Sequence, residues 1–335
     1  MGEPRYNLAS ALPRMAAQHP HRPAVIFPAG RQGPWGRFIQ LSFAQLDRLT
    51  DVYAHGLSAG GIRRADRVLV LIRPGVDLIA VVFALFKIGA VPVLIDPGMG
   101  LKPFLQCVAE TEPVGLVGIP VAHVLRRLFP RAFGSIRHGV WVGRGPRRAR
   151  LDCLPDGEGR PFPVANTGPD EEGAVAFTSG STGIPKGVVY RQGMFRAQLD
   201  ILRTQLDMRD GDSHLAAVYI FALYNPTLGI TTVFPDMDPA RTARLNPARL
   251  GEAIDTFGVT LSMGSPTVWR ILCDYCEPRG LSFPTLRVIH MFGAPCEPDL
   301  IRRCTGLFPR ATVYTPFGAT EALPLTLMDH REILD

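Results

Sequence analysis

Short apolar runs alternate with longer amphipathic segments along most of the chain, and this alternation constrains the fold more than any other feature. Residues 67–72 and 91–95 have the length and composition of buried strands, and residues 77–88 between them have those of a helix. Strands that alternate with helices predict a parallel sheet with helices on both faces. The expected fold class is therefore α/β. The other expected strands are 23–27, 114–118, 139–142, 174–177, 214–218, 231–234, 260–262, 286–291 and 311–314, and the other expected helices are 8–19, 42–60, 101–110, 121–129, 192–206, 247–257, 266–276 and 298–308.

One segment interrupts this alternation. Residues 143–173 are rich in Gly, Pro and Arg and then become acidic, as in a surface connection between two lobes. The expected domains are thus a first α/β lobe at 1–142, a connecting loop at 143–173 and a second α/β lobe at 174–335. A chain of 335 residues is long enough to bury the cores of two such lobes.

The composition is that of a soluble globular protein, with 46% hydrophobic and 20% charged residues. The net charge of +6 is spread thinly apart from an Arg-rich stretch at 144–150, so we expect no nucleic-acid partner, although the basic balance suits anionic substrates. The apolar stretch 78–95 is interrupted by Lys87, which predicts a core helix and strand and no integral membrane segment. Cys273 and Cys276 form a Cys-x-x-Cys pair without a second pair at zinc spacing, and the N-terminus has no apolar run. These features predict a cytoplasmic protein with reduced cysteines.

The most informative motif connects the expected strand 174–177 to a second short apolar strand. It combines glycines, hydroxyl side chains and one cation, in Thr178, Ser179, Gly180, Ser181, Thr182, Gly183 and Lys186. Glycines let the backbone approach a ligand, hydroxyl and amide groups donate to anionic oxygens, and Lys186 adds a point charge suited to phosphate. Pro185 and Gly187 on either side of the lysine exclude a Walker A loop, and a Gly-x-Ser-x-Gly elbow is also absent. The motif predicts a loop that wraps a polyphosphate, with a flexible linker as the alternative.

This stretch resembles the phosphate-binding signature of the acyl-adenylate-forming superfamily, which includes acyl-CoA synthetases, luciferases and the adenylation domains of nonribosomal peptide synthetases. The resemblance implies ATP and Mg²⁺ as cofactors, with Lys186 in the catalytic machinery. It also implies two stacked Rossmann-like sheets, mixed or parallel, with flanking helices, as in the large N-terminal domain of these enzymes.

A second segment, residues 292–296, follows the expected strand 286–291, and ligands of open α/β sheets bind beyond the carboxyl ends of strands. Its sequence, Phe-Gly-Ala-Pro-Cys, resembles the superfamily's Gly-Gly-Ala-Pro segment. By that resemblance Gly293, Ala294 and Pro295 contact adenine. An ordinary turn between a strand and a helix is the alternative.

A third segment, residues 315–321, is expected to be a loop after the strand 311–314 and resembles the superfamily's Tyr-Gly-x-Thr-Glu segment. The resemblance implies that Phe317 stacks on adenine beside Gly318. It also implies that Thr320 bonds the α-phosphate and that Glu321 holds Mg²⁺. An aromatic face, a hydroxyl and a hard carboxylate suit a nucleotide with its metal, whereas an isolated Thr-Glu pair would be a helix start.

Residues 217–229 lie where many acyl-CoA synthetases carry a His near the acyl carboxylate, and here there is none. Aromatic side chains, notably Phe221 and Tyr224, stand there instead. Together with Phe292, which replaces a glycine of the superfamily's segment, they would line and narrow an apolar acyl pocket. A buried helix is the alternative.

Three segments resemble a narrower group, the olefin β-lactone synthetases: Phe-Ala-Leu-Tyr-Asn-Pro-Thr-Leu-Gly at 221–229, His-Met-Phe-Gly-Ala-Pro at 290–295, and Phe-Gly-Ala-Thr-Glu-Ala-Leu-Pro at 317–324. This resemblance implies ATP-dependent adenylation of a long-chain β-hydroxy acid, then closure to a β-lactone with release of AMP and pyrophosphate. It also implies a complex with other enzymes of hydrocarbon biosynthesis. For the base that accepts the hydroxyl proton, His214 and His290 are candidates by residue type, with a structural role as the alternative.

Two other functions stay open. A fatty acyl-CoA or acyl-AMP ligase would share the adenylation step. A non-catalytic nucleotide-binding remnant is the other, because the superfamily's ribose-binding Asp, hinge Arg and C-terminal domain with its catalytic Lys are missing from residues 1–335. We therefore expect poor turnover from these residues alone.

Overall fold

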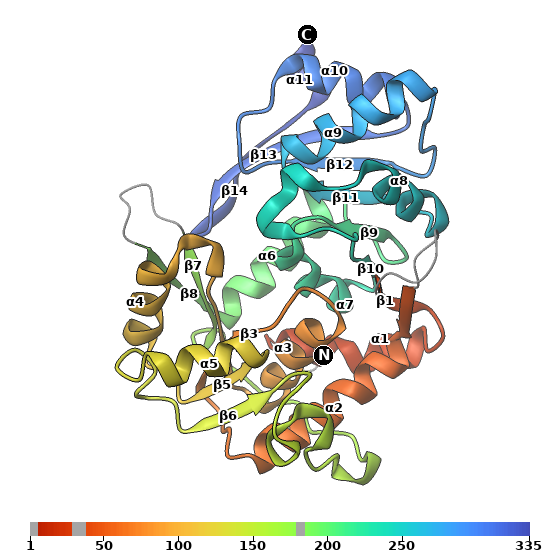
Figure 1. The fold of residues 1–335 in the computed structure, drawn as a ribbon. Helices are drawn as coiled ribbons and strands as arrows, with labels where there is room; N and C mark the ends of the chain where they lie inside the picture. Colours follow the sequence, from red (N-terminus) through yellow and green to blue (C-terminus); the bar gives the residue numbers. More distant parts are fainter. Residues whose placement is uncertain (1–5, 29–37, 179–184) are drawn as a thin grey trace. The chain divides into compact units, whose positions relative to one another are not determined.

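A computed structural model describes residues 6–28, 38–178 and 185–335, and within them the strands form two sheets with flanking helices (Figure 1). The expected α/β class is confirmed. The chain divides into two compact units, Met1–Pro20 with Ala44–Gln198, and His21–Phe43 with Leu199–Asp335. Each unit holds one of the sheets.

The first unit contains a six-stranded sheet in the order β6-β5-β3-β4-β7-β8. Its strands pair in parallel except at one edge, where β8 is the antiparallel partner of β7. Helix α3 is buried along nearly its whole length, as expected of a segment that is apolar on all sides. The strands are β3 (Arg67–Leu71), β4 (Val91–Leu94), β5 (Gly115–Gly118), β6 (His138–Trp141), β7 (Glu172–Thr178) and β8 (Lys186–Arg191), and the helices are α1 (Leu12–Gln18), α2 (Phe43–Ala59), α3 (Val76–Ile88), α4 (Leu101–Thr111), α5 (Pro120–Leu128) and α6 (Gln192–Thr204), which continues into the second unit.

The second unit contains an eight-stranded sheet in the order β14-β13-β12-β11-β9-β10-β1-β2. Its central strands are parallel, and each edge is closed by an antiparallel pair, β1 with β2 and β13 with β14. The strands are β1 (Pro23–Pro28), β2 (Phe38–Ser42), β9 (Ser213–Ala216), β10 (Thr231–Val233), β11 (Leu261–Gly264), β12 (Val288–Met291), β13 (Thr312–Ala319) and β14 (Ala322–Asp329), and the helices are α7 (Asn225–Leu228), α8 (Pro247–Thr256), α9 (Pro266–Cys276), α10 (Pro298–Leu307) and α11 (His330–Leu334).

The expected lobe boundaries at 142 and 173 differ from this division. Strand β7 pairs with β4 through Val93 and Val175, so the hairpin of β7 and β8 belongs to the first sheet. Strand β1 pairs with β10 through Val25 and Thr232, which places an N-terminal hairpin in the second sheet. The expected connecting loop 143–173 also lies within the first unit, where the Ala165 amide donates to the Lys87 carbonyl oxygen at 2.8 Å. Local periodicity identifies strands and helices, but it does not reveal which sheet each strand joins.

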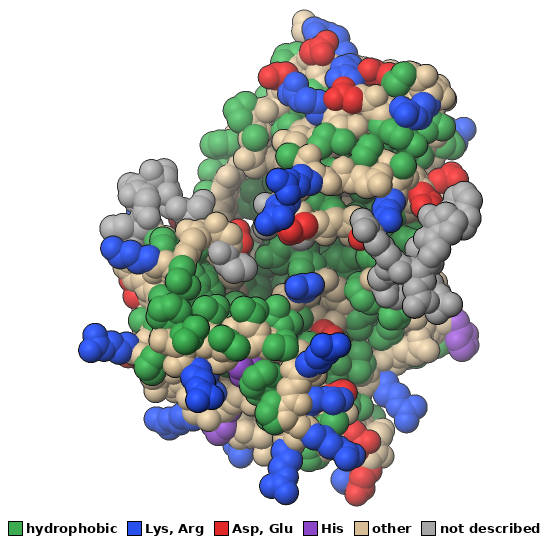
Figure 2. Space-filling model, viewed as in Figure 1, with side chains coloured by type: hydrophobic (Ala, Val, Ile, Leu, Met, Phe, Trp, Pro, Cys, Tyr) green, Lys and Arg blue, Asp and Glu red, His purple; other side chains and the backbone are tan. Residues whose placement is uncertain are grey.

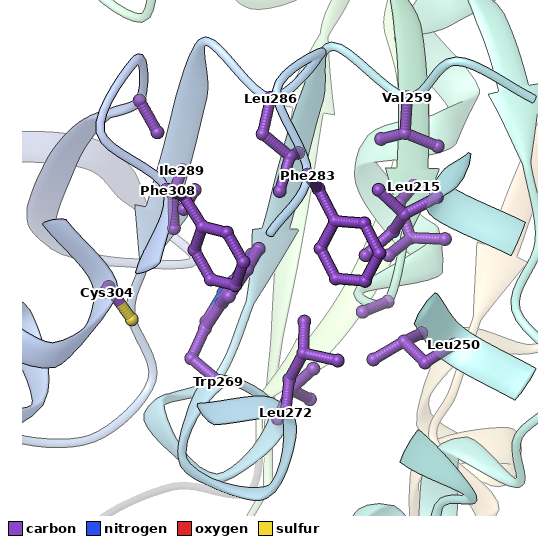
Figure 3. Close-up of a cluster of buried hydrophobic side chains, with 14 of the residues drawn as sticks. Leu215, Leu250, Val259, Trp269, Leu272, Phe283, Leu286, Ile289, Cys304 and Phe308 are labelled. Atoms are coloured by element: carbon purple, nitrogen blue, oxygen red, sulfur yellow. The ribbon is translucent and has the colours of Figure 1, made fainter. Parts of the chain in front are cut away.

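Helices α8, α9 and α10 cover one face of the second sheet with a large apolar core (Figure 3). Helix α9 begins with Pro266 at its first position and buries Val268, Trp269 and Leu272 at helical spacing. The Trp269 ring lies edge-on to Phe308, with centroids 6.1 Å apart. This packed layer supports β9, β11, β12 and β13 from one side, and the segments that follow these strands carry the candidate site residues.

Candidate nucleotide and acyl site

The motif predicted to bind phosphate lies between two antiparallel strands of the first unit. Thr178 ends β7 and Lys186 begins β8, and the two residues are opposite each other in the ladder. The Lys186 side chain is exposed, so its amine is available to a ligand. The strands expected on both sides of the motif are present. Ser179, Gly180, Ser181, Thr182 and Gly183 lie outside the described residues, and their phosphate contacts stay predictions.

The other candidate residues belong to the second unit, at the edge where its parallel strands end. Strands β9, β11, β12 and β13 are neighbours in parallel register, so their carboxyl ends meet at one edge. The segments that follow β9 and β12, together with the last residues of β13, therefore gather there. These segments are residues 217–224, 292–296 and 315–321.

The aromatic residues expected to line an acyl pocket are partly brought together at this edge. Phe221 lies in a 3₁₀ helix, Tyr219–Tyr224, and its ring is edge-on to Phe292 with centroids 5.3 Å apart. Phe221 is buried, whereas Phe292 and Tyr224 are half-buried. The alternative expected for residues 217–229, a buried helix, is therefore present in part, as this short 3₁₀ helix. An edge-to-face pair fixes the two rings against each other and presents an apolar wall.

Small residues follow Phe292 and leave backbone accessible. Gly293 has φ of +86°, a left-handed conformation that residues with a Cβ rarely adopt. Gly293, Ala294 and Pro295 are all exposed. A flat ring could lie against this backbone without meeting a long side chain.

Residues 315–321 are not a loop, contrary to expectation. Strand β13 continues to Ala319, and Thr320 and Glu321 form the turn into β14. The Pro and Gly of the segment indicate a loop, but pairing with β14 overrides that local signal. A Cβ on Gly318 would lie 2.7 Å from the backbone carbonyl oxygen of Ala322 in the paired strand, so the hairpin itself requires glycine there. No sequence signal revealed this second role, because β14 was not predicted.

The hairpin presents the remaining nucleotide-binding candidates at its tip. The Phe317 side chain is 67% exposed, which leaves its ring open to stacking. Glu321 is exposed and Thr320 is half-buried. Among the described residues no group of three or more His, Cys, Asp or Glu side chains could hold a metal by itself. A single carboxylate nevertheless fits Mg²⁺ that is bound mainly by phosphate oxygens, because this ion keeps water and phosphate ligands and needs only one or two carboxylates.

The two histidines considered for proton transfer lie in the interior of the second unit. Both imidazoles are fully buried, and the His214 ring and the Asn225 side-chain amide lie 3.0 Å apart. Asn225 in turn donates to Thr232 Oγ1 at 2.9 Å, and the His290 ring stacks on Tyr314 with centroids 5.5 Å apart. Burial lowers the pKa of His214 to about 4, and burial together with the neighbouring His214 lowers the pKa of His290 to about 3. These surroundings favour a structural role for both.

The free energy of unfolding is expected to fall between pH 7 and pH 5, partly because of His290. An unfolded histidine has a pKa near 6.5 and takes up a proton in this range, whereas buried His290 stays neutral, so protons favour the unfolded chain. Its share of the loss is about 2 kcal/mol. Urea unfolding at both pH values should show a correspondingly smaller loss for His290→Leu. The control His21→Leu, at an exposed histidine, should lose as much stability between pH 7 and pH 5 as the unsubstituted chain. Equal losses in all three proteins would show that His290 does not cause the pH dependence.

Comparison with known proteins identifies the family of the chain. The profile of the AMP-binding enzyme family matches residues 12–334. An olefin beta-lactone synthetase of Xanthomonas campestris pv. campestris is 41% identical over 98% of this chain and 59% of its own length, and one of Stenotrophomonas maltophilia is 40% identical over 98% and 60%. The N-terminal domain of FACL13 from Mycobacterium tuberculosis has a similar fold, with a TM-score of 0.82 at 20% identity over 98% of this chain and 80% of that one. The chain belongs to the AMP-binding enzyme family.

Proposed function

We propose that these residues form the nucleotide- and acyl-binding part of a β-lactone synthetase, which adenylates a long-chain β-hydroxy acid and closes it to a lactone. The observation that carries this proposal is the 41% and 40% identity, over 98% of the chain, to two olefin beta-lactone synthetases. A salicyl-AMP ligase is 30% identical and a 2-succinylbenzoate–CoA ligase 27%. The chain spans 59% of the length of the Xanthomonas relative, so the complete reaction is part of the proposal.

In the proposed first step, a carboxylate oxygen of the acid attacks the α-phosphorus of ATP, and the bond to pyrophosphate breaks. Lys186 and the hydroxyl and amide groups at 178–183 offset the charge that develops on the leaving pyrophosphate. Thr320 donates to the α-phosphate, and Phe317 with the segment 293–295 holds the adenine. Glu321 would bind Mg²⁺, which when present offsets phosphate charge.

In the proposed second step, the β-hydroxyl oxygen of the same substrate attacks the acyl carbonyl carbon, and the bond to AMP breaks as the four-membered ring closes. The hydroxyl proton is released to the phosphate of the leaving AMP or to solvent. The aromatic wall of Phe221 and Phe292, with Tyr224 nearby, would hold the chain so that hydroxyl and carbonyl meet. Holding two reacting groups of one molecule together supplies a proximity effect, and an apolar pocket excludes water that would hydrolyse the adenylate.

A fatty acyl-CoA ligase is the second candidate, since it shares the first step. The fold is compatible with it, because a long-chain-fatty-acid–CoA ligase from Archaeoglobus fulgidus has a TM-score of 0.81 at 22% identity over 98% of this chain and 67% of that one. The absence of a His in residues 217–229 argues against it.

The product distinguishes the two candidates. Because poor turnover is expected from residues 1–335 alone, the assay uses a full-length protein in which these residues are joined to the C-terminal domain of the family. It is incubated with ATP, Mg²⁺ and a 2-alkyl-3-hydroxy fatty acid, with and without CoA, and products are identified by NMR at low temperature because β-lactones lose CO₂ on heating. A lactone that forms without CoA supports the synthetase. A thioester that forms only with CoA would assign the protein to the ligases, and no AMP release under any condition would favour a non-catalytic remnant.

The variant Phe292→Gly is expected to widen the acyl pocket. Removing one ring from its wall should raise the ratio of kcat/KM for an acid with a bulky α-branch to kcat/KM for the unbranched acid about tenfold. The reason is that room for one or a few methylenes in an apolar pocket changes kcat/KM by about this factor. Competition assays with paired acids measure this ratio. Phe129→Leu, at a half-buried aromatic of the first unit, is the control, and an unchanged ratio in Phe292→Gly would remove this residue from the pocket.

We also propose a cytoplasmic location and a complex with other enzymes of hydrocarbon biosynthesis. In the part of the chain that the structure describes, none of the helices combines the length and apolar character that a bilayer crossing requires. The proposed substrate has a long acyl chain, and transfer between neighbouring enzymes would keep it out of water.

A further inference from the structure

Residues 113–151 of the first unit contain basic side chains but no acidic ones. Between Glu112 and Asp152 there are eight arginines and no Asp or Glu. Two of them have partners, since Arg126 donates to the Ile136 carbonyl oxygen at 2.7 Å and Arg150 pairs with Asp152. The other six are exposed and form no ion pair with any residue that the structure describes; they are Arg127, Arg131, Arg137, Arg144, Arg147 and Arg148.

The same segment exposes an apolar stripe on helix α5. Val121, Val124 and Leu128 are 55%, 51% and 64% exposed, and their spacing places them on one face of the helix. The opposite face packs on the sheet, where Ala122 joins the core cluster that also contains Phe104 of α4. Figure 2 shows hydrophobic side chains over the α4 and α5 region bordered by Lys and Arg. Contiguous apolar patches rimmed by polar residues mark interaction sites.

The arginines flank this stripe at both of its ends. The His123 ring of α5 stacks on Trp141, the last residue of β6, with centroids 4.0 Å apart. The contact of Arg126 with Ile136 places the other end of α5 near the start of β6. Helix and strand therefore run antiparallel. The residues 144–148 follow β6 at the Val121 end, and Arg127, Arg131 and Arg137 lie towards the Leu128 end.

We propose that this surface, the α5 stripe (Val121, Val124, Leu128) with its six flanking arginines, docks on an anionic lipid bilayer. Aliphatic side chains on a folded helix can enter the boundary between headgroups and acyl chains, while arginines pair with lipid phosphates. A nucleic acid fits less well, because a phosphate backbone would leave the three aliphatic side chains in water and single strands are held by exposed aromatics. The proposal does not depend on the reaction that the protein catalyses.

Cosedimentation with vesicles tests the proposal. The 335-residue chain should bind vesicles of equal parts phosphatidylglycerol and phosphatidylcholine, bind pure phosphatidylcholine vesicles at least tenfold more weakly, and dissociate as salt is raised. The exposed arginines should contribute about fivefold each, so Arg127→Gln and Arg144→Gln should each lower the partition coefficient by that factor. Leu128→Ser should lower it by about fivefold to tenfold through lost apolar contact.

Matched variants in the second unit serve as controls. Arg302→Gln, Arg310→Gln and Leu281→Ser alter exposed residues of the same types, and their vesicle binding should equal that of the unsubstituted chain. Equal binding to anionic and zwitterionic vesicles, or equal losses in the control variants, would overturn the proposal. So would an oligonucleotide that binds more tightly than the vesicles and is unaffected by Leu128→Ser, because that result would assign the arginines to a nucleic acid.

Discussion

Replacement of Lys186 by Gln is expected to lower the rate of acyl-adenylate formation about 10²-fold to 10³-fold. Lys186 begins β8 directly after the glycine-rich motif, and its exposed amine is the cation that we propose for the phosphates. The charge on the leaving pyrophosphate grows in the transition state, so the loss should appear mainly in kcat. Exchange of labelled pyrophosphate into ATP, driven by the β-hydroxy acid, measures this step.

Lys102→Gln is the matched control, because Lys102 is another exposed lysine of the same unit. Its exchange rate should stay within about twofold of the unsubstituted protein, as surface charges remote from a site act weakly. A Lys186→Gln variant with the same rate as the Lys102→Gln variant would show that Lys186 does not contact the reacting phosphates.

Replacement of Lys87 by Met is expected to lower the free energy of unfolding by about 3–5 kcal/mol at pH 7. Lys87 is 1% exposed, and its ammonium lies 2.5 Å from Asp51 Oδ1 and 2.6 Å from Asp47 Oδ1. Burial already raises the pKa of Asp47, against the opposing effect of Lys87. Without the cation, two neighbouring carboxylates stay in a poorly hydrated site with no counter-charge. Urea denaturation measures the loss.

Two further measurements separate charge from packing at this site. The triple variant Lys87→Met, Asp47→Asn, Asp51→Asn should regain most of the lost stability, because replacing a whole buried ion cluster is far less harmful than leaving charge unpaired. The deficit of Lys87→Met should also shrink at acidic pH, since protonation of the raised-pKa Asp47 removes the repulsion. A deficit below about 1 kcal/mol, or one that does not change with pH, would show that the carboxylates do not need the lysine.

Elements with a strong internal period were predictable from the sequence. Helix α9 has the expected bounds, Pro266–Cys276, because a first-position proline and apolar residues at helical spacing are local signals. Strand β3 ends one residue before the expected 67–72. The candidate site segments were also predictable from the sequence. Glycines, a lysine and a Thr-Glu pair are residue types that suit a nucleotide, and they can be recognised without knowing the tertiary contacts.

Elements that depend on a distant partner were not predictable. Strands β2 and β14 were not predicted, and a loop was predicted at 315–321. Both strands are edge elements held by one antiparallel partner, and Pro316, Gly318 and Pro324 are residue types that indicate turns. Lys87 shows the same limit for a single residue. In sequence it only interrupts an apolar run, and the reason for its burial, Asp47 and Asp51 one helical turn apart on α2, lies far away along the chain.

The sequence by itself determined the α/β class and the family signature, and it named the candidates for binding ATP, because residue types and local periods need no tertiary partner. Only the tertiary structure decided which sheet each strand joins, with the β7–β8 hairpin in one unit and the β13–β14 hairpin in the other. It also decided that Phe221 meets Phe292 and that the arginines after Glu112 flank an exposed apolar stripe. The physical reason is that strand pairing and burial are set by contacts between residues remote in sequence, and their free energy exceeds the local preferences that a sequence pattern records.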